Sequence, residues 1–457
     1  MSQFDLIILG GGPGGYLAAE RAGQAGLRVL LIEKRALGGV CLNEGCIPSK
    51  ALLHSAKIYD YANGEGEKYG VSVTGASVDQ SKVLARKNKV VKMLVSGIAA
   101  QLKKNQVTVE YGLGEILGKS AEGFRCTVEG REYVGKRLLV ATGSEPVLPP
   151  IPGLEEAMRS GFGMTNREIL DLAQIPERLV IIGAGVVGLE MASYYNSVGS
   201  QVTVIEMLDH IAGQADREIA AILQRNYEKK GVKFLLQSKV TGFGPGEISY
   251  EQEGRTKAIQ ANKVLISIGR KPAISGFGLE TLAPEMDGWA IKTDQNSRTS
   301  IAGLYACGDV NGRSMLAHTA YREAEVAVNH MLGKKDSMRY NAIPGVIYTN
   351  PEVASVGETE ETAKQKNLDV RCVTISMLYS GRYVAENEGG DGICKLVIDK
   401  KHDRLLGVHM IGNYASEIIY GAALMIETEL RIENLKELVF PHPTVCEAIR
   451  EALFMME

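Results

Sequence analysis

The chain carries one strand–turn–helix–strand pattern twice, and this repeat constrains the fold more than any other feature. The segment DLIILGGGPGGYLAAERAGQAGLRVLLIEK begins at Asp5, and RLVIIGAGVVGLEMASYYNSVGSQVTVIEM begins at Arg178. The turn glycines are Gly10, Gly12 and Gly15 in the first copy and Gly183, Gly185 and Gly188 in the second. Each copy ends in an acid, Glu33 or Glu206, at the same distance from its first glycine. Single glycine turns are common, but two copies with matching acid spacing predict two dinucleotide-binding folds.

Each glycine of the pattern has a physical reason. The first turns the chain, the second lets the backbone approach a pyrophosphate, and the third lets the helix pack closely on the strand. The phosphate then faces free N–H groups and the positive end of the helix dipole. The acid accepts hydrogen bonds from ribose hydroxyls and disfavours a 2′-phosphate. Because Met207 and Leu208, rather than an arginine, follow Glu206, the second copy is predicted to prefer NAD over NADP.

Two further apolar segments, 138–144 (LLVATGS) and 299–310 (TSIAGLYACGDV), each end in a turn of small residues. They predict a flavin domain that is split by the insertion of the second copy. A buried carboxylate at Asp309 would bind ribityl hydroxyls, although Asp309 considered alone is an ordinary turn residue. From about residue 341 the pattern changes to α+β, with a hairpin over 394–412 and an apolar helix over 417–428.

The expected fold is therefore α/β, with two Rossmann-like domains and a C-terminal α+β dimerisation domain. The predicted boundaries are 1–145 for the first part of the FAD-binding domain, 146–268 for the NAD-binding domain, 269–340 for the second FAD or central part, and 341–457 for the interface domain.

Two thiols, Cys41 and Cys46, stand five residues apart soon after the first glycine turn. On an ideal helix their Cα atoms would lie roughly 8–9 Å apart, whereas a disulfide needs about 7 Å or less. Gly45 offers the backbone freedom to tighten the segment, and Pro48 suits the first turn of a following helix. The arrangement predicts a redox disulfide beside a bound cofactor.

Composition excludes several classes of protein. The 457 residues carry a formal net charge of −3, which gives no indication of a nucleic-acid partner. No apolar run reaches the length of a membrane span, and no signal or transit peptide is visible. The seven cysteines are an odd number in a large chain and favour a reducing, cytoplasmic setting. No cysteine or histidine cluster has metal-site spacing, so no metal is expected.

The motifs GGGPGG, CLNEGCIPSK, VATGS, GAGVVGLE, YACGDV, MLAHTA and HPTVCEAIREA together resemble those of the pyridine nucleotide-disulfide oxidoreductases, in the order of that family and over essentially the whole chain. The resemblance implies one non-covalent FAD per subunit, NAD⁺ or NADH as cosubstrate, and a homodimer whose active site is shared between subunits. It is nearest to the members that oxidise protein-bound dihydrolipoyl groups with NAD⁺. The implied partner is a lipoyl domain of an acyltransferase core or a lipoyl carrier protein, in a 2-oxo acid dehydrogenase or glycine cleavage complex.

The same resemblance assigns roles to single residues. It implies that Cys41 exchanges with the substrate and that Cys46 passes electrons to the flavin. His442 suits a general base because its ordinary pKa is near neutrality, and Glu447 would orient it. Lys50 is implied to lie near the flavin and to pair with Glu190. The remaining implied contacts are Gly10, Gly12, Gly15, Glu33, Lys50, Gly114, Thr142, Gly143, Ser144, Asp309, Ala317 and His318 for FAD, and Gly183, Gly185, Gly188, Glu190, Glu206, Val240 and Gly269 for NAD.

Two positions depart from the usual family pattern: Glu44 between the thiols, and Cys446 beside Glu447. Three alternative functions each conflict with a feature of the sequence. A glutathione-reductase-like enzyme would need arginines for NADP, which Glu206 opposes. A mercuric reductase would end in a vicinal cysteine pair, but this chain ends in LFMME. A flavoprotein transhydrogenase without dithiol chemistry would lack Cys41 or Cys46, and both are present.

Overall fold

The computed structural model describes residues 2–455, and these form two compact units. The first unit comprises Met1–Ala51, Leu84–Val147 and Gly269–Arg339, and the second comprises Leu52–Val83, Leu148–Ile268 and Tyr340–Glu457. Each unit contains one copy of the sequence repeat.

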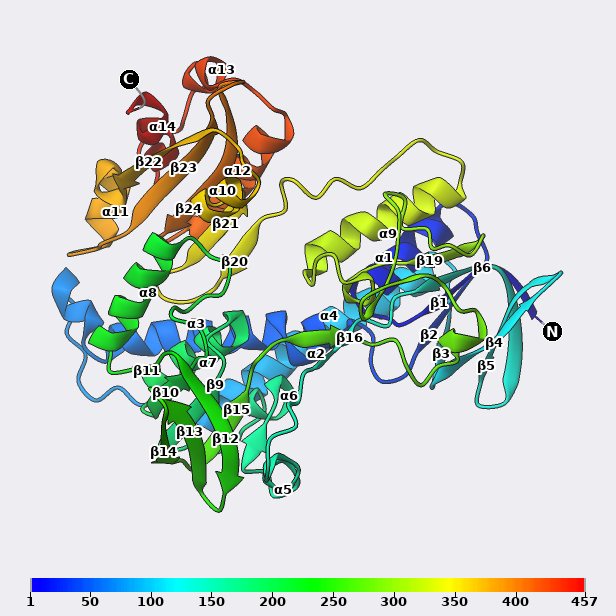
Figure 1. Ribbon diagram of the computed structural model, residues 1–457, viewed down its shortest axis with the longest axis horizontal. Helices are drawn as coiled ribbons and strands as arrows, with labels where there is room; N and C mark the ends of the chain where they lie inside the picture. The colour runs from blue at the N-terminus through cyan, green and yellow to red at the C-terminus, as the bar shows by residue number, and fades with distance from the viewer. Residues whose placement is uncertain (1, 456–457) are drawn as a thin grey trace. The chain divides into compact units, whose positions relative to one another are not determined.

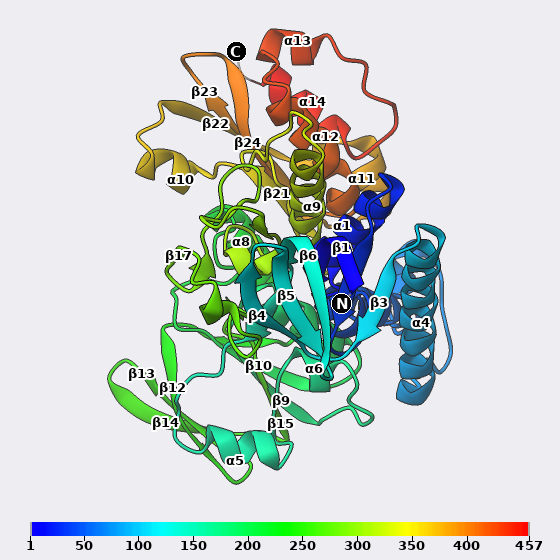
Figure 2. The ribbon, with the colours of Figure 1, turned by 90° about the vertical axis from the view of Figure 1, so that its right-hand side faces the viewer.

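The first unit is built on a sheet whose order is β3-β2-β1-β6-β5-β4, with β19 also paired to β6. The parallel strands are β1 (Ser2–Leu9), β2 (Val29–Glu33), β3 (Thr108–Tyr111), β6 (Arg131–Val140) and β19 (Leu304–Ala306). The sheet continues with β5 (Gly123–Val128), which is antiparallel to β6, and then with β4 (Gly114–Ser120), which is antiparallel to β5 (Figure 2).

Both faces of this sheet are covered, because successive residues of β1 point to opposite sides. Leu6 and Ile8 pack into a core with α1 (Pro13–Gln24) and α9 (Ala317–Met331). Ile7 and Leu9 pack into a second core with strands β4 to β6 and with Phe277. A strand buried on both faces explains why the sequence LIIL shows no polar alternation.

The second unit repeats this architecture. Its parallel sheet has the order β11-β10-β9-β15-β8, with β9 (Arg178–Ile182), β10 (Gln201–Ile205), β11 (Lys233–Leu235), β15 (Lys263–Ile266) and β8 (Gly163–Met164). The crossover helix is α7 (Val186–Ser197), and α8 (Arg217–Lys229) precedes β11. A three-stranded meander, β12 (Ser238–Gly244), β13 (Glu247–Gln252) and β14 (Arg255–Gln260), takes the place of the antiparallel strands of the first unit.

The C-terminal part of the second unit is a five-stranded antiparallel sheet of order β20-β21-β24-β23-β22 (Figure 1). Its strands are β20 (Gly345–Ile347), β21 (Val353–Gly357), β22 (Val370–Ser376), β23 (Ile393–Asp399) and β24 (Arg404–Ile411). One face packs on α12 (Ala415–Glu427), α13 (Ile432–Lys436) and α14 (Glu447–Phe454). The expected hairpin over 394–412 is confirmed as β23–β24, and the expected apolar helix is confirmed as α12.

The remaining helices frame the candidate site or join the sheets. They are α2 (Gly39–Glu44), α3 (Cys46–Ala62), α4 (Gln80–Lys104), α5 (Leu154–Arg159), α6 (Asn166–Ile169), α10 (Glu360–Gln365) and α11 (Gly381–Glu386). The expected fold class is confirmed, since both Rossmann-like sheets and the C-terminal α+β sheet are present.

Candidate active site

The two glycine turns have nearly the same geometry. Gly10 and Gly183 adopt φ values of 103° and 102°, and a Cβ on either would lie 2.3 Å from the carbonyl oxygen of a neighbouring chain segment. A Cβ on Gly15 or Gly188 would lie 1.8 or 2.1 Å from the carbonyl oxygen of the first glycine of its turn. Only glycine fits such positions. The first and third glycines therefore shape the turn and the helix–strand contact.

The middle glycine of each turn leaves space instead. Gly12 and Gly185 are the N-caps of α1 and α7, with φ near −75° and no side-chain cap. A Cβ on Gly185 would meet nothing within 4 Å, and one on Gly12 would meet only the Cα of Gly39 at 3.8 Å. Uncapped helix N-termini beside open space are suited to bind phosphate oxygens. The residues present therefore fit a dinucleotide in both copies.

The two acids are held in equivalent ways. Glu33 accepts hydrogen bonds from the N–H of Gly11 at 2.6 Å and from the N–H of Arg35 at 2.7 Å. Glu206 accepts from Ala184 at 2.7 Å and from Leu208 at 2.9 Å. In each case one oxygen contacts the glycine turn and the other contacts the residue two positions beyond the acid. Each carboxylate is thus oriented at the edge where a ribose would lie beside the pyrophosphate.

A polar corner follows the ends of β6 and β19. Thr142 donates its hydroxyl hydrogen to the carbonyl of Ala273 at 2.7 Å, and the hydroxyl of Ser144 donates to the carboxylate of Asp309 at 2.5 Å. Arg270 donates to both the hydroxyl and the carbonyl of Ser144, each at 2.7 Å. The sequence did not reveal Arg270 as a member of this corner. Asp309 is half-buried rather than buried as expected, and it begins a short 3-10 helix whose other residues, Val310 and Asn311, are buried.

The structure places the other predicted cofactor residues in different environments. Gly114 is buried beyond the ends of β1 and β2, where a Cβ would lie 2.8 Å from Leu9. Ala317 is the first residue of α9 and His318 is the second, so the expected helix N-terminus is present there. Gly143 and Gly269 adopt positive φ values of 74° and 118°. Val240 belongs to the hydrophobic core of the second repeat, which does not require a ligand contact. Their roles remain predictions.

The two thiols lie across a break between two helices. Cys41 is in α2 and Cys46 is the first residue of α3, with Gly45 between the helices. A Cβ on Gly45 would approach the carbonyl oxygen of Val40 to 3.0 Å, so glycine suits this tight passage. Pro48 lies in the first turn of α3, as expected. In the described residues the two cysteines are not joined by a disulfide; Cys41 is half-buried and Cys46 is exposed.

The thiols interact with each other. Hydrogen bonding to Cys46, together with burial, raises the pKa of Cys41 far above its ordinary value. The positive charge of Lys50 acts in the opposite direction and lowers that pKa. The same charge would stabilise a thiolate on either sulfur. The spacing problem posed by a continuous helix is thus solved by the break at Gly45.

Two tyrosines near the thiols were not identified from the sequence. The hydroxyls of Tyr16 on α1 and Tyr321 on α9 hydrogen-bond to each other. Burial is the main cause of the raised pKa of each, and a negative charge on Cys41 would raise both further. Neutral hydroxyls beside a sulfur are possible donors to a thiolate. No motif indicates such a pair, because its members come from helices far apart in the sequence.

Glu44 is the first of the two departures from the family pattern, and its negative charge is paired with Arg35. Its carboxylate accepts a hydrogen bond from Arg35 at 2.7 Å. The ion pair joins α2 to the segment that follows β2.

The predicted base and its partner lie together in the second unit. The Nδ1 atom of His442 is 2.9 Å from Oε1 of Glu447, and the other oxygen of Glu447 accepts from the N–H of Thr444 at 2.9 Å. Burial alone would raise the pKa of Glu447, but the Thr444 N–H and His442 outweigh it and lower that pKa. The His442 side chain is 77% exposed, whereas that of Glu447 is 17% exposed. Glu447 thus anchors a ring whose other face is open.

Two further hydroxyls support this loop. The buried Ser380 donates to the carbonyl of Thr444 at 3.0 Å, and Thr444 donates its own hydroxyl hydrogen to the carbonyl of Pro441 at 2.6 Å. With that hydrogen committed, the Thr444 oxygen is left to accept from the Cys446 thiol 2.9 Å away. Cys446 is the second departure from the family pattern. Its thiol therefore contacts the hydroxyl of Thr444 rather than His442.

Glu190 is buried in α7, where it accepts a hydrogen bond from the N–H of Tyr348 at 3.1 Å. Its predicted pairing with Lys50 would join the two units and stays a prediction. Among residues 2–455, no group of three or more histidine, cysteine or acidic side chains is arranged to hold a metal ion. Within the same residues, no helix combines the length and apolar character that crossing a membrane requires.

Comparison with known proteins decides the family. The family model described as pyridine nucleotide-disulphide oxidoreductase matches residues 4–324. The chain belongs to this family. The model of the family's dimerisation domain matches residues 343–453, which contain the five-stranded sheet and the His442 loop.

Members of this oxidoreductase family resemble the chain over its full length. It is 40% identical to a mitochondrial dihydrolipoyl dehydrogenase of Pisum sativum, over 98% of this chain and 90% of that protein. It is 36% identical to a dihydrolipoyl dehydrogenase of Cupriavidus necator, over 100% of this chain and 98% of that protein. A solved structure of the HOCl-induced flavoprotein disulfide reductase RclA from Escherichia coli superposes with a TM-score of 0.86 at 26% identity, covering 99% and 100% of the two chains.

Proposed function

We propose that this protein oxidises protein-bound dihydrolipoyl groups with NAD⁺, using Cys41 and Cys46 as its redox pair. One observation carries the proposal: the two thiols contact each other across the break at Gly45, beside Lys50, in a chain that matches dihydrolipoyl dehydrogenases along its whole length. The serving complex would be a 2-oxo acid dehydrogenase or a glycine cleavage system, with a lipoyl domain or lipoyl carrier as partner.

We assign FAD to the first repeat and NAD to the second. FAD would be held by the turn at Gly12, by Glu33, and by the Ser144–Asp309 corner, and NAD by the turn at Gly185 and by Glu206. The bound flavin would supply the transfer of an electron pair between the enzyme dithiol and the nicotinamide. The domain boundaries 1–145, 146–268, 269–340 and 341–457 belong to the same proposal.

The thiol chemistry follows from exchange at sulfur. In the oxidised enzyme a substrate thiolate attacks Sγ of Cys41, the Cys41–Cys46 bond breaks, and Cys46 leaves as a thiolate. The second substrate sulfur then attacks the first, which closes the lipoyl disulfide and releases Cys41. Two electrons have moved from the substrate to the enzyme pair. Lys50 would stabilise the thiolate that forms.

Each attack needs a deprotonated substrate thiol, because the thiolate is the nucleophile. We assign this proton to His442, whose Nε2 is available while Nδ1 faces Glu447. The carboxylate holds the ring orientation and stabilises the imidazolium that forms. Because His442 lies in the dimerisation domain, we propose a homodimer in which the His442 loop of one subunit serves the thiols of the other.

The sequence favours the cytoplasm, while the relatives include both bacterial and mitochondrial proteins. We propose the cytoplasm.

A steady-state assay tests the function. The purified protein is given lipoamide or oxidised glutathione as acceptor, with NADH and then with NADPH as donor. Reduction of lipoamide by NADH is expected, with little use of NADPH because Glu206 occupies the place of a 2′-phosphate. Turnover of glutathione with NADPH, and none of lipoamide with NADH, would overturn the proposal.

A further inference from the structure

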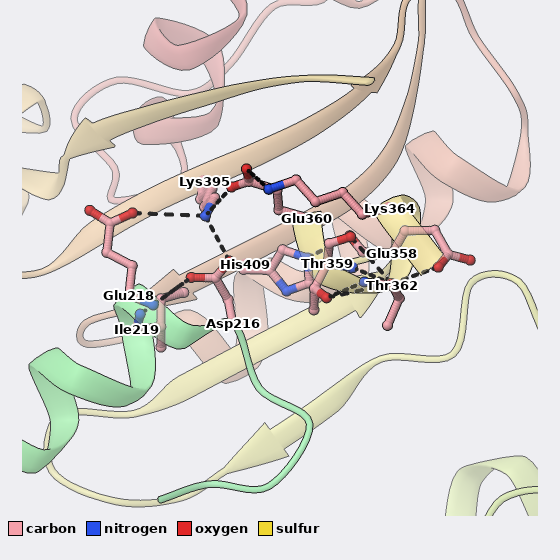
Figure 3. A network of polar contacts seen from close by, with 10 residues as sticks. All are labelled: Asp216, Glu218, Ile219, Glu358, Thr359, Glu360, Thr362, Lys364, Lys395 and His409. Atoms are coloured by element: carbon pink, nitrogen blue, oxygen red, sulfur yellow. Dashed lines mark hydrogen bonds and ion pairs between the residues drawn. The ribbon is translucent and has the colours of Figure 1, made fainter. Parts of the chain in front are cut away.

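A buried lysine lies between two domains of the second unit and has no role in the chemistry above. The side chain of Lys395, on β23, is 8% exposed. Its Nζ atom is 2.8 Å from Oδ2 of Asp216, 3.3 Å from Glu360 and 3.9 Å from Glu218 (Figure 3). Asp216 and Glu218 follow the second repeat and lie outside the dimerisation domain, whereas Lys395 and Glu360 belong to it.

The sheet itself directs Lys395 away from the hydrophobic core. Its neighbours Cys394 and Leu396 point into the core that contains α12 and α14, so Lys395 points to the opposite face. Its cross-strand partner on that face is His409. The Nε2 atom of His409 donates to the carbonyl of Glu358 at 2.8 Å, and burial lowers the pKa of this imidazole. Burial thus disfavours the charged form of His409 beside Lys395.

Lys395 keeps its charge in this environment. Burial by itself would lower the pKa of Lys395, but the carboxylates of Asp216 and Glu360 outweigh it and raise that pKa above its ordinary value. Glu360 is shared with the exposed Lys364 at 2.9 Å. Asp216 has a completely buried side chain, and Lys395 lies at ion-pair distance from it.

Asp216 in turn connects Lys395 to the glycine turn. Its Oδ1 atom caps α8 by accepting from the N–H groups of Glu218 at 3.0 Å and Ile219 at 3.4 Å. The segment 207–216 runs from Glu206, the predicted ribose ligand, to this cap. Midway along it, the N–H of Ala212 donates to the carbonyl of Ala184 at 2.9 Å. The segment is thus held at Glu206, at the turn, and at Asp216.

The other end of α8 contacts the dimerisation domain as well. Asn226 donates to the carboxylate of Asp391 at 2.9 Å. Helix α8 therefore cannot shift along its axis without breaking contacts at both ends.

We propose that Lys395 is a positioning residue for the dinucleotide site of the second repeat: by holding Asp216 it fixes the segment 207–216, and so sets the orientation of Glu206 and the turn that receives NAD. This inference rests on the proposed function, because that function assigns NAD to the second repeat. A residue of the dimerisation domain thereby contributes to NAD affinity without touching the nucleotide.

Two single substitutions test the role of the Lys395–Asp216 ion pair in the full-length, flavin-loaded protein. Lys395→Met removes the charge at similar length, and Asp216→Ser removes the ion pair but keeps a helix-capping oxygen. Each is expected to raise the dissociation constant for NAD⁺, measured by calorimetry, about fivefold or more. The KM for dihydrolipoamide should stay within about twofold, since the thiols lie elsewhere. The double variant should lose no more than the larger single loss, because both changes break one interaction.

The matched control is Lys400→Met, which removes an exposed lysine that pairs with Asp369 at 2.8 Å beside the same strand. It should leave NAD⁺ affinity unchanged. An unchanged NAD⁺ dissociation constant in either folded variant, or losses that multiply in the double variant, would overturn the proposal. If Lys395→Met fails to fold, the NAD⁺ affinity of Asp216→Ser tests the proposal by itself. This variant should fold, because Lys395 still has Glu360 as a partner.

A measurement without nucleotide separates this inference from the proposed function. Hydrogen exchange at the Ala212 amide should accelerate about tenfold or more in Lys395→Met, because the segment 207–216 loses an anchor. If exchange accelerates but the wild-type protein binds no NAD⁺, the proposed function fails, while the conclusion that Lys395 holds the segment 207–216 is supported. If wild-type protein binds NAD⁺ and exchange is unchanged in the variant, the positioning role of Lys395 fails.

Discussion

The middle glycine of the second turn offers the sharpest test of the NAD assignment. Gly185 has φ −78° and ψ −175°, which any residue adopts, and a Cβ there would meet no atom within 4 Å. In Gly185→Ala the poorer N-cap costs roughly 0.5–1 kcal/mol. The reduced entropy of the unfolded chain offsets about 0.4–1 kcal/mol of this. The free energy of unfolding should therefore change by less than about 1 kcal/mol.

The effect on NAD⁺ should be much larger. The new methyl group occupies the space where a pyrophosphate would approach the first N–H groups of α7. Losing one hydrogen bond to a charged group costs about 1.5–3 kcal/mol, which is roughly a 10- to 150-fold rise in dissociation constant. Reduction of the flavin by dihydrolipoamide in the absence of NAD⁺ should stay within about twofold, because Gly185 lies in the other repeat.

Calorimetric titration with NAD⁺ measures the affinity, and thermal unfolding measures the stability. Gly97→Ala is the control, since Gly97 is an exposed residue of α4 with equally open space, and it should bind NAD⁺ normally. Gly188→Ala marks the contrasting case, because its Cβ would lie 2.1 Å from a backbone oxygen and should prevent correct folding of the turn. A stable Gly185→Ala variant with wild-type NAD⁺ affinity would refute the assignment of this turn to pyrophosphate.

Three other substitutions address the thiols and the base. Cys46→Ser should eliminate the thiolate-to-flavin charge-transfer absorbance on partial reduction, and persistence of that band would show that the sulfur roles are assigned wrongly. His442→Gln should slow dihydrolipoamide oxidation by about 10²- to 10⁴-fold, with little change in NADH oxidation by artificial acceptors; equal losses in both reactions would argue against a base acting on substrate thiols. Glu447→Gln removes the anion beside His442, so the pH profile of dihydrolipoamide oxidation should shift its basic group to a lower pKa, and an unshifted profile would contradict the orienting role. Because the pKa of Glu447 is lowered in the folded protein, this residue adds stability above the ordinary carboxyl pKa, and the wild type loses that stability as the pH falls through the lowered value. In thermal melts from pH 7 to pH 3 the melting temperature should therefore fall less in Glu447→Gln than in the wild type, since other carboxyls with lowered pKa values, such as Asp294 and Asp336, are present in both.

The parts of the fold that sequence predicts are those that depend on local pattern. The glycine turns, their helices and their acids follow from spacing within about thirty residues, and both copies fold as expected. The break between Cys41 and Cys46 was likewise predictable, because helix geometry forbids the contact and Gly45 permits it.

Contacts between distant segments were not predictable in this way. Tyr16 and Tyr321 meet because α1 and α9 cover one face of the first sheet. Lys395 reads in the sequence as one polar residue in an alternating strand, and nothing nearby indicates that its partner is the cap of α8. In each case the partner is chosen by packing of whole elements rather than by local spacing.

The exposure of His442 bears on how the enzyme must assemble. A base whose side chain is 77% exposed cannot by itself exclude water from the thiols that it is proposed to serve. Yet its partner Glu447 is largely buried and is fixed by Thr444, and Thr444 is itself held by the buried Ser380. A loop that is fixed by buried hydrogen bonds but leaves its histidine exposed is typical of a surface that a second subunit covers. Val439, three residues earlier, is 95% exposed, and the adjacent Leu438 is 44% exposed. The dimerisation domain therefore explains both observations: association of two copies would bury Val439 and bring His442 into a closed site, so a monomeric variant should retain NADH oxidation by artificial acceptors while losing dihydrolipoamide oxidation.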